Sequence, residues 1–357
     1  MELFIAGGCG EHGRNCFHVT GAAGTFLVDC GVMAGEGADG YPRLSPGQID
    51  RLGTVFLTHS HGDHAGALPW LLERGYTGRV VASRHTLAQL PFSLPNGVPL
   101  EELCPHGRGA YRELDVAWGR TGHCVGSVWY RFTEGGKTIL FSGDYPEHSQ
   151  VYARDPLRGQ TADLAVLDCA YGRGGTSYEI ACGALGTRVD ALLETYPLLL
   201  FPVPKYGRGL ELLRLLRGAR PGLPCCGDSH FMGQLAATAR PDGWLKPLPG
   251  DFARWASPLT GRETAGLVFV SDPQLRSPAA QTLARGVLDR GGHGVMTGTP
   301  EADGYSARLL AEGRMELLRY PVHLGCPQFK ALERENKFAR TIPYHSADFP
   351  ACQVTVF

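Results

Sequence analysis

Short apolar runs separated by glycine-rich turns dominate the first sixty residues and predict strands joined by tight turns. These runs lie at residues 2–7, 15–20, 25–31 and 54–59. The segment 64–75 spaces its apolar residues like a short helix. Further strand-like runs lie at residues 78–83, 125–132, 137–144 and 162–170. Strand pairs followed by covering helices predict an α/β layered domain with the sheet in the middle.

The pattern changes after about residue 175, where helical periodicity begins to alternate with short, continuously apolar strands. Helices are predicted at 179–196, 207–218 and 281–291, and strands at 198–204, 266–272 and 294–299. This alternation is typical of a parallel, doubly wound sheet. We therefore predict a first domain over 1–175, an inserted domain over 176–305, and a return to the first domain over 306–357. The return is predicted to use "MELLRYPV" and "TIPYHSADF".

Composition narrows the class of protein. A chain of 357 residues with 43% apolar residues fits about two globular domains. The 34 Lys and Arg residues balance 35 Asp and Glu residues, which argues against a strongly basic nucleic-acid coat but leaves room for a local basic channel. No window is apolar enough for a membrane span, and Glu2 stands where a signal peptide would be basic.

Cysteine usage points to a reducing setting. The eleven cysteines are odd in number, form no C-x-x-C pair, and mostly lie inside apolar runs. We interpret them as small buried thiols and expect a cytoplasmic protein.

The segment "THSHGDHAG" concentrates candidate chemistry directly after an apolar strand. His59 and His61 are two residues apart, so an extended backbone sends both side chains to one side. Asp63 and His64 follow as the chain turns into a helix, where they can face a second cation. Imidazole and carboxylate groups are the ligands that zinc and similar cations prefer. A metal site therefore explains this spacing better than a polar loop that happens to be rich in histidine.

Two more candidate ligands follow strands further along the chain. His123 stands beside glycines in "GHCVGS", and Asp144 follows a buried-type strand in "ILFSGDY". Either residue alone would be interpreted as an ordinary loop residue. Together with the histidine-rich segment they predict a site with two neighbouring cations, which needs about six or seven converging ligands.

These motifs resemble the metallo-β-lactamase fold and, within it, the β-CASP nuclease branch that includes ribonuclease J proteins. The resemblance rests on "GGCGEHGRNC", "FLTHSHGDHAGALPWLL", "GHCVGS", "FSGDY", "LDCAYG" and "FPVPKYGRGLELL", which occur in the family's order. It implies an α/β fold: an αββα sandwich carrying an inserted, doubly wound β-CASP-like domain. It covers most of the chain and is most specific in the first half.

The resemblance also implies roles for individual residues. His59, His61 and His123 would hold one divalent cation, Asp63 and His64 would hold the second, and Asp144 would bridge both. Asp168 in "LDCAYG" matches an acidic residue that orients active-site histidines. The cations are expected to be two zinc ions, with manganese as the alternative.

The late motifs of the family match less well. The family's proton-donating histidine aligns with Ser346 in "PYHSADF", one residue after His345, so a bulge must aim His345 inward or the general acid is missing. The family's last histidine ligand is not found before Phe357, so either the sequence is truncated or the site is completed differently. His323 in "YPVHLG" has a similar local context but precedes the other motif, and we interpret this as coincidence.

The resulting expectation is a metal-dependent phosphodiester hydrolase that cleaves RNA, or single-stranded DNA, with a hydroxide bridging two cations. Asp63 would help accept the proton of that nucleophile, and His345 is the candidate general acid. Lys205 and Arg208 in "VPKYGRG" are candidate phosphate contacts near a helix start. The alternatives are a hydrolase of a small ester or phosphodiester and a weakly active nucleic-acid-binding homologue. The sequence does not determine the oligomeric state.

Overall fold

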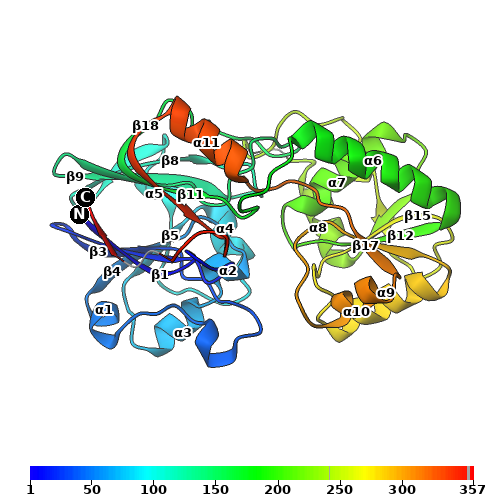
Figure 1. Ribbon diagram of the computed structural model, residues 1–357, viewed down its shortest axis with the longest axis horizontal. Coiled ribbons are helices and arrows are strands. Elements are labelled where there is room, and N and C mark those ends of the chain that lie inside the picture. Colours follow the sequence, from blue (N-terminus) through cyan, green and yellow to red (C-terminus); the bar gives the residue numbers. More distant parts are fainter. Residues whose placement is uncertain (241, 352–353) are drawn as a thin grey trace. The chain divides into compact units, whose positions relative to one another are not determined.

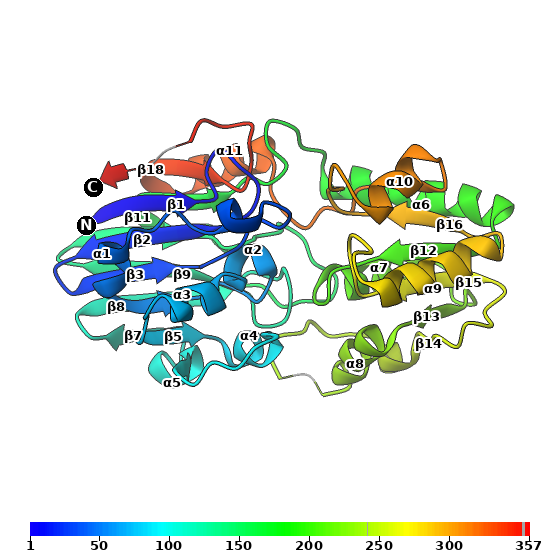
Figure 2. The same cartoon turned by 90° about the horizontal axis from the view of Figure 1, so that it is seen from below.

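The computed structural model describes residues 1–240, 242–351 and 354–357 (Figures 1 and 2). The chain divides into two compact units. The first unit comprises Met1–Glu147, Arg154–Gly175 and His323–Phe357, and the second comprises His148–Ala153 and Thr176–Val322.

The first unit contains a mixed, seven-stranded sheet in the order β19-β1-β2-β3-β4-β5-β6 within the part of the chain that the structure describes. Strands β1 to β3 are antiparallel, as predicted, whereas β3 to β6 run parallel to one another. In the order of the sheet, the strands are β19 (Val354–Val356), β1 (Glu2–Gly7), β2 (Cys16–Gly21), β3 (Gly24–Val28), β4 (Leu52–Phe56), β5 (Arg79–Ala82) and β6 (Gly97–Pro99).

A second sheet of the same unit has the order β18-β11-β10-β9-β8-β7. Its parallel pairs are β10 with β11 and β11 with β18. The strands are β18 (Lys337–Tyr344), β11 (Thr161–Asp168), β10 (Lys137–Phe141), β9 (Val128–Glu134), β8 (Leu114–Arg120) and β7 (Arg108–Tyr111). The helical segments of the unit are η1 (Gly37–Gly40), α1 (Pro46–Asp50), α2 (Gly62–Ala65), α3 (Leu68–Glu73), α4 (Arg84–Gln89), α5 (Leu100–Leu103) and α11 (Cys326–Glu335).

Successive side chains of a strand point to opposite faces of its sheet, and this alternation packs the layers against one another. In β3, Phe26 packs against Phe132 of the second sheet, with ring centroids 4.7 Å apart, whereas the next residue, Leu27, lies in the cluster that includes α1 and α3. On the far side, Phe329 of α11 packs with Leu140 of β10. Each sheet thus buries one face against the other sheet and one against helices, which confirms the predicted αββα sandwich.

The second unit is built on a six-stranded sheet, order β14-β13-β15-β12-β16-β17, in which each pair of neighbours is parallel. Helices α6 and α7 lie on one face, and α9 and α10 on the other (Figure 1), which confirms the doubly wound prediction. The strands are β12 (Leu198–Pro202), β13 (Cys225–Gly227), β14 (Ser257–Pro258), β15 (Gly266–Val270), β16 (His293–Met296) and β17 (Met315–Leu317). The helices are α6 (Tyr178–Thr195), α7 (Arg208–Ala219), α8 (Ser229–Ala237), η2 (Phe252–Arg254), α9 (Pro278–Asp289) and α10 (Tyr305–Ala311).

The return to the first unit differs from the expected position at residue 306. Helix α10 and strand β17 belong to the second unit, because β17 pairs in parallel with β16, and the chain returns only at His323. The sequence pattern places the apolar run at 315–322 in the first domain, whereas the structure places it in the second unit. A short apolar run indicates a strand but carries no information about which sheet it joins.

Within the described ranges, no helix combines the length and apolar character needed to cross a bilayer.

Candidate metal centre

The histidine-rich segment leaves the end of β4 and begins helix α2. His61 is the extended N-cap residue of α2, and Asp63 and His64 lie within its single turn. His59 and His64 are fully buried, whereas the Asp63 side chain is 30% exposed. Close backbone packing holds the turn, since a Cβ at Gly31 would lie 1.7 Å from the Asp63 carbonyl oxygen. The four candidate ligands therefore point inward from one short, tightly supported corner.

The structure brings His59, His61, His123 and Asp144 together as one donor set, with one donor atom from each within 4.8 Å of the others. His61 Nδ1 lies 3.1 Å from His59 Nε2 and 3.2 Å from His123 Nε2. Asp144 Oδ2 lies 3.5 Å from the Nε2 atoms of His59 and His123. Three imidazoles and one carboxylate that converge in this way are a donor set suited to zinc or a similar cation.

A second donor set lies on the other oxygen of Asp144. It comprises Asp63, His64 and His345. Asp144 Oδ1 lies 3.1 Å from His64 Nε2 and 3.2 Å from His345 Nδ1, and His345 Nε2 lies 2.9 Å from Asp63 Oδ2. Each carboxylate oxygen of Asp144 therefore faces a different set, the arrangement expected of a bridging ligand.

His345 reaches this site through an unusual backbone conformation. It directly follows β18 with a φ of 71°, in the left-handed region, and its N–H donates to the Gly8 carbonyl. The side chain is 2% exposed. Of the two alternatives left open by the sequence, the structure has the inward-pointing His345.

His323 is the residue that sequence reasoning set aside. Its Nδ1 lies 3.1 Å from Asp168 Oδ2 and 3.7 Å from Asp144 Oδ2, and its side chain is 11% exposed. The structure thus brings His323 into the cluster with Asp144, Asp168 and His345. The only signal in the sequence was its local context, "YPVHLG", because Asp144 and Asp168, the carboxylates that it faces, precede it by more than a hundred residues in the chain.

Asp168 ends β11 as a fully buried carboxylate. Besides His323, its Oδ2 accepts a hydrogen bond from the Tyr145 N–H at 3.1 Å, and its Oδ1 accepts one from the Ala170 N–H at 3.0 Å. These contacts fix the carboxylate, so that it can orient the His323 ring. The predicted orienting role therefore has a specific histidine as its target.

Asp29, Thr58 and Asn15 also support the site, and sequence reasoning missed them. Asp29 Oδ2 lies 2.8 Å from His64 Nδ1, and Oδ1 accepts the Thr58 N–H at 2.7 Å. The Asn15 Nδ2 lies 2.9 Å from His64 Nε2. A carboxylate on Nδ1 leaves Nε2 to face the donor set, which is the usual outer-shell arrangement of a metal-binding histidine. The strand-end position of Asp29 in "LVDCG" was the available signal.

The electrostatics of the cluster demand positive charge. Burial and the neighbouring His64 hold the pKa of His59 well below its usual value, so His59 is a neutral imidazole with a lone pair to donate. Burial opposes protonation of His345, but the Asp144 and Asp63 carboxylates overcome it and raise its pKa to about 10.

The carboxylates show the complementary effect. Burial alone would raise the pKa of Asp144, but the surrounding histidines, His64 first, hold it well below its usual range. Protons on histidines or divalent cations can balance these carboxylates, so cation binding would displace protons. His345 Nδ1 lies 3.2 Å from Asp144 Oδ1, but among the described residues no group forms a well-directed hydrogen bond with this buried nitrogen. Donor chemistry, charge and this nitrogen all fit divalent cations.

The two candidate substrate contacts lie in the second unit. Arg208 is the first residue of α7 and is half-buried, whereas Lys205 is exposed two residues before the N-cap, Gly207. Gly207 has a φ of 96°, which favours glycine at the turn into the helix.

Residues 9–156 match a family model described as the metallo-beta-lactamase superfamily. The chain is 32% identical over 234 residues to Ribonuclease TTHA0252 of Thermus thermophilus, covering 58% of this chain and 54% of that protein. It is 24% identical over 263 residues to Transcription termination factor FttA of Methanosarcina mazei, covering 62% of this chain and 40% of that protein. The Drosophila melanogaster Cleavage and polyadenylation specificity factor 73 is 24% identical over 245 residues, covering 60% of this chain and 35% of that protein.

A solved structure shares the fold along almost the whole chain. A protein of unknown function from Enterococcus faecalis V583 aligns with 97% of this chain and 94% of its own, at a TM-score of 0.59 and 12% identity. This likeness shows the fold alone. The curated relatives confirm the predicted resemblance to the nuclease branch, although the chain spans only about half of their length or less. Residues 9–156 thus match the metallo-β-lactamase superfamily, and the relatives of the chain are named as ribonucleases and RNA-cleavage or termination factors.

Proposed function

We propose that this metallo-β-lactamase-domain chain is a metal-dependent hydrolase that cleaves phosphodiester bonds in RNA, with single-stranded DNA as the alternative substrate. The observation that carries the proposal is the position of Asp144 between two donor sets. The names of the relatives support RNA as the substrate. The proposal includes a cytoplasmic setting.

The two donor sets would hold two divalent cations, with zinc favoured and manganese the alternative. His59, His61 and His123 would hold one, Asp63, His64 and His345 would hold the other, and Asp144 would contact both. Bound there, the cations would lower the pKa of water and neutralise charge on a phosphodiester. The partly exposed Asp63 is the carboxylate placed to accept a proton from the attacking water.

We assign His345 and His323 different roles from those the sequence implied. His345 is almost completely buried, and its two nitrogens face Asp63 and Asp144. It therefore serves better as a ligand than as a proton donor. His323 is more exposed, and Asp168 holds its Nδ1. His323 Nε2 is then the atom that would protonate the departing oxygen, with Asp168 as its positioning residue.

Lys205 and Arg208 remain proposed phosphate contacts. A positively charged side chain beside the first turn of a helix is a suitable partner for a phosphate group, since the backbone N–H groups of that turn also attract anions. Both residues belong to the second unit, whose role in the proposal is to bind the nucleic-acid strand.

The central test measures metal content and cleavage on the same preparation. We expect about two zinc or manganese ions per chain by elemental analysis. The chain should shorten a 5′-monophosphorylated single-stranded RNA and stop when a chelator is added. Single-stranded DNA of the same sequence, assayed in parallel, decides the substrate.

Variants make this test specific to the site. His61→Ala should lower the cleavage rate by about three orders of magnitude because it removes a ligand. The exposed His106 provides the matched control, and His106→Ala should cleave as the unchanged chain does. Unchanged cleavage by His61→Ala would show that the assigned site is wrong. Tight RNA binding without cleavage would instead support the weakly active binding homologue.

A further inference from the structure

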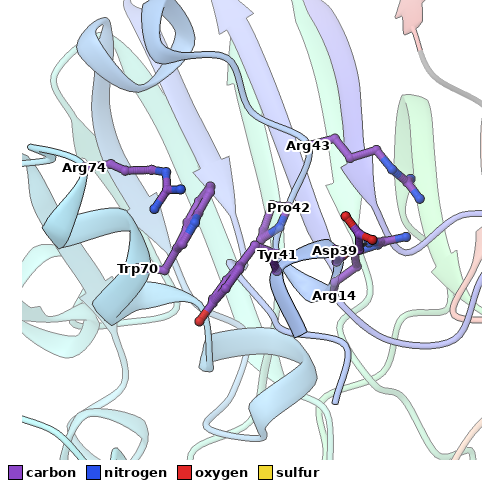
Figure 3. Close-up of a pocket in the computed structure, with 8 residues that line it drawn as sticks. Arg14, Asp39, Tyr41, Pro42, Arg43, Trp70 and Arg74 are labelled. Carbon is purple, nitrogen blue, oxygen red and sulfur yellow. Dashed lines mark hydrogen bonds between the residues drawn. The ribbon is translucent and has the colours of Figure 1, made fainter. Parts of the chain in front are cut away.

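A second candidate site is a cavity on the first unit, lined by residues that are not part of the metal centre. Its volume is about 390 Å³, and it is lined by Arg14, Ala38, Asp39, Tyr41, Pro42, Arg43, Trp70 and Arg74 (Figure 3). This volume lies within the range of small-molecule sites and could accommodate a nucleotide-sized group. None of the roles proposed above for the metal centre uses this cavity.

One loop links the cavity to the metal centre. In the glycine-rich segment between β1 and β2, His12 stacks on His345 with ring centroids 4.4 Å apart, and Asn15 contacts His64. Arg14, between these two residues, lines the cavity. The same segment therefore contacts two histidines of the metal centre and also forms a wall of the cavity.

The arginines of the cavity differ in how many of their N–H groups are already bound within the protein. Arg14 is 9% exposed in its side chain and is held by Glu11, with its Nε and Nη2 atoms 2.7 and 2.6 Å from the carboxylate oxygens. It also donates to the Asp39 carbonyl. Arg43 is 57% exposed and, within the described chain, donates one side-chain hydrogen bond, to Glu11 at 3.0 Å. Arg14 thus builds the wall, whereas most N–H groups of Arg43 remain available to a ligand.

Arg74 is exposed and is fixed by an aromatic stack. Tyr41 and Trp70 lie parallel, 5.2 Å apart with an interplanar angle of 7°, and the Arg74 guanidinium lies 4.4 Å from the Trp70 ring centroid. Figure 3 shows Trp70 between Tyr41 and Arg74. Stacking holds the guanidinium plane and leaves its N–H edge available, which lowers the entropy lost when it binds an anion.

We propose that this cavity binds backbone phosphates of the single-stranded RNA substrate through Arg43 and Arg74. The lining itself contains three guanidinium groups and one carboxylate, that of Asp39. Arginine suits this task because its fork of donors matches the geometry of phosphate oxygens. The inference rests on the proposed function, since it takes RNA as the substrate.

The experiment measures binding of a fluorescent single-stranded RNA in chelator, where cleavage cannot contribute, at several salt concentrations. The double variant Arg43→Gln/Arg74→Gln should bind about ten-fold more weakly. The slope of log affinity against log salt should decrease by about 1.4, since each phosphate contact on a single strand contributes about 0.7. The charge-preserving variant Arg43→Lys/Arg74→Lys should keep the slope.

The matched control is Arg51→Gln/Arg79→Gln, which removes two exposed arginines from the same unit and should bind RNA as the unchanged chain does. Hydrolysis of bis(p-nitrophenyl) phosphate, which contains no nucleotide, reports the metal centre alone and should be equal in the unchanged chain and the three double variants. If the unchanged chain does not hydrolyse this compound, the proposed function is contradicted, whereas the cavity proposal is still decided by the RNA-binding measurements.

Two results would overturn the cavity proposal. One is RNA affinity and salt dependence of the Gln double variant equal to those of the unchanged chain. The other is saturable binding of adenosine monophosphate or inorganic phosphate that depends on Arg43 and Arg74 but does not compete with RNA. The second result would assign the cavity to a free phosphate compound.

Discussion

Each unit buries a carboxylate whose surroundings differ in kind. In the second unit, Glu211 of α7 is 2% exposed and accepts hydrogen bonds from the Gln150 N–H at 2.9 Å, the Val151 N–H at 3.2 Å and the Tyr320 hydroxyl at 2.8 Å. The Ser149 hydroxyl donates to it as well. These donors satisfy the carboxylate within the protein and attach the 148–153 segment to its unit.

Asp144 in the first unit is equally buried, but most of its close partners are imidazoles. His59, His64, His123, His323 and His345 each place a ring nitrogen within 3.7 Å of its oxygens. Hydroxyl and amide donors remain donors at neutral pH, whereas an imidazole can give up its proton and become a ligand. The character of the partners, and not burial, therefore distinguishes the structural carboxylate of Glu211 from Asp144, the candidate metal ligand.

The largest expected difference between the two regions follows from replacing each carboxylate with its amide. We expect Asp144→Asn to lower RNA cleavage by about three orders of magnitude and to reduce bound metal, because one donor set loses its oxygen and the other keeps only a neutral amide oxygen. Glu211→Gln should keep its metal but lose about 1.5–3 kcal/mol of unfolding free energy, since charged hydrogen bonds are weakened. Elemental analysis and urea unfolding measure these effects. Equal metal loss in both variants would invalidate the distinction.

Within the metal centre, substitutions of His323 and His345 should differ in their effects on kcat and on metal content. His323→Ala should lower kcat about 10²- to 10³-fold with metal content unchanged, because it removes a proton donor and not a ligand. His345→Ala should lower metal content. Metal loss from His323→Ala would instead assign it as a ligand.

Substitution of Asp29 should have a smaller effect on cation binding. Asp29→Asn should weaken cation affinity about 10- to 100-fold, because the carboxylate that orients the His64 ring loses its charge. Competition with a chromogenic chelator measures this affinity. Asp163→Asn, at a partly exposed carboxylate that contacts Lys137, is the control and should not change it. A normal affinity in Asp29→Asn would exclude the orienting role.

The smallest expected effect is a pH dependence of stability in the chelated chain. The folded-state pKa of His345, about 10, lies above its ordinary value of 6.5. Its contribution to stability is therefore fully present below pH 6.5 and is lost as the pH rises towards 10. We expect the Tm in chelator to fall over this interval and the zinc-loaded chain to show a weaker dependence. An increase of Tm with pH in chelator would contradict this electrostatic picture.

The sequence by itself determined the corner that carries His59, His61, Asp63 and His64. These residues lie within six positions, so a strand end, Gly62 and one helical turn are enough to set their directions. The layered fold was equally accessible, because apolar periodicity of two and of 3.6 residues follows directly from backbone geometry.

Only the tertiary structure decided how the site is completed. Parallel pairing of β11 with β18 places Asp168 opposite Tyr344, and the left-handed turn at the next residue directs His345 inward. The late return of the chain at His323 brings that histidine onto Asp168. Strand register and partner choice depend on packing between segments far apart in the chain, and no local pattern encodes them.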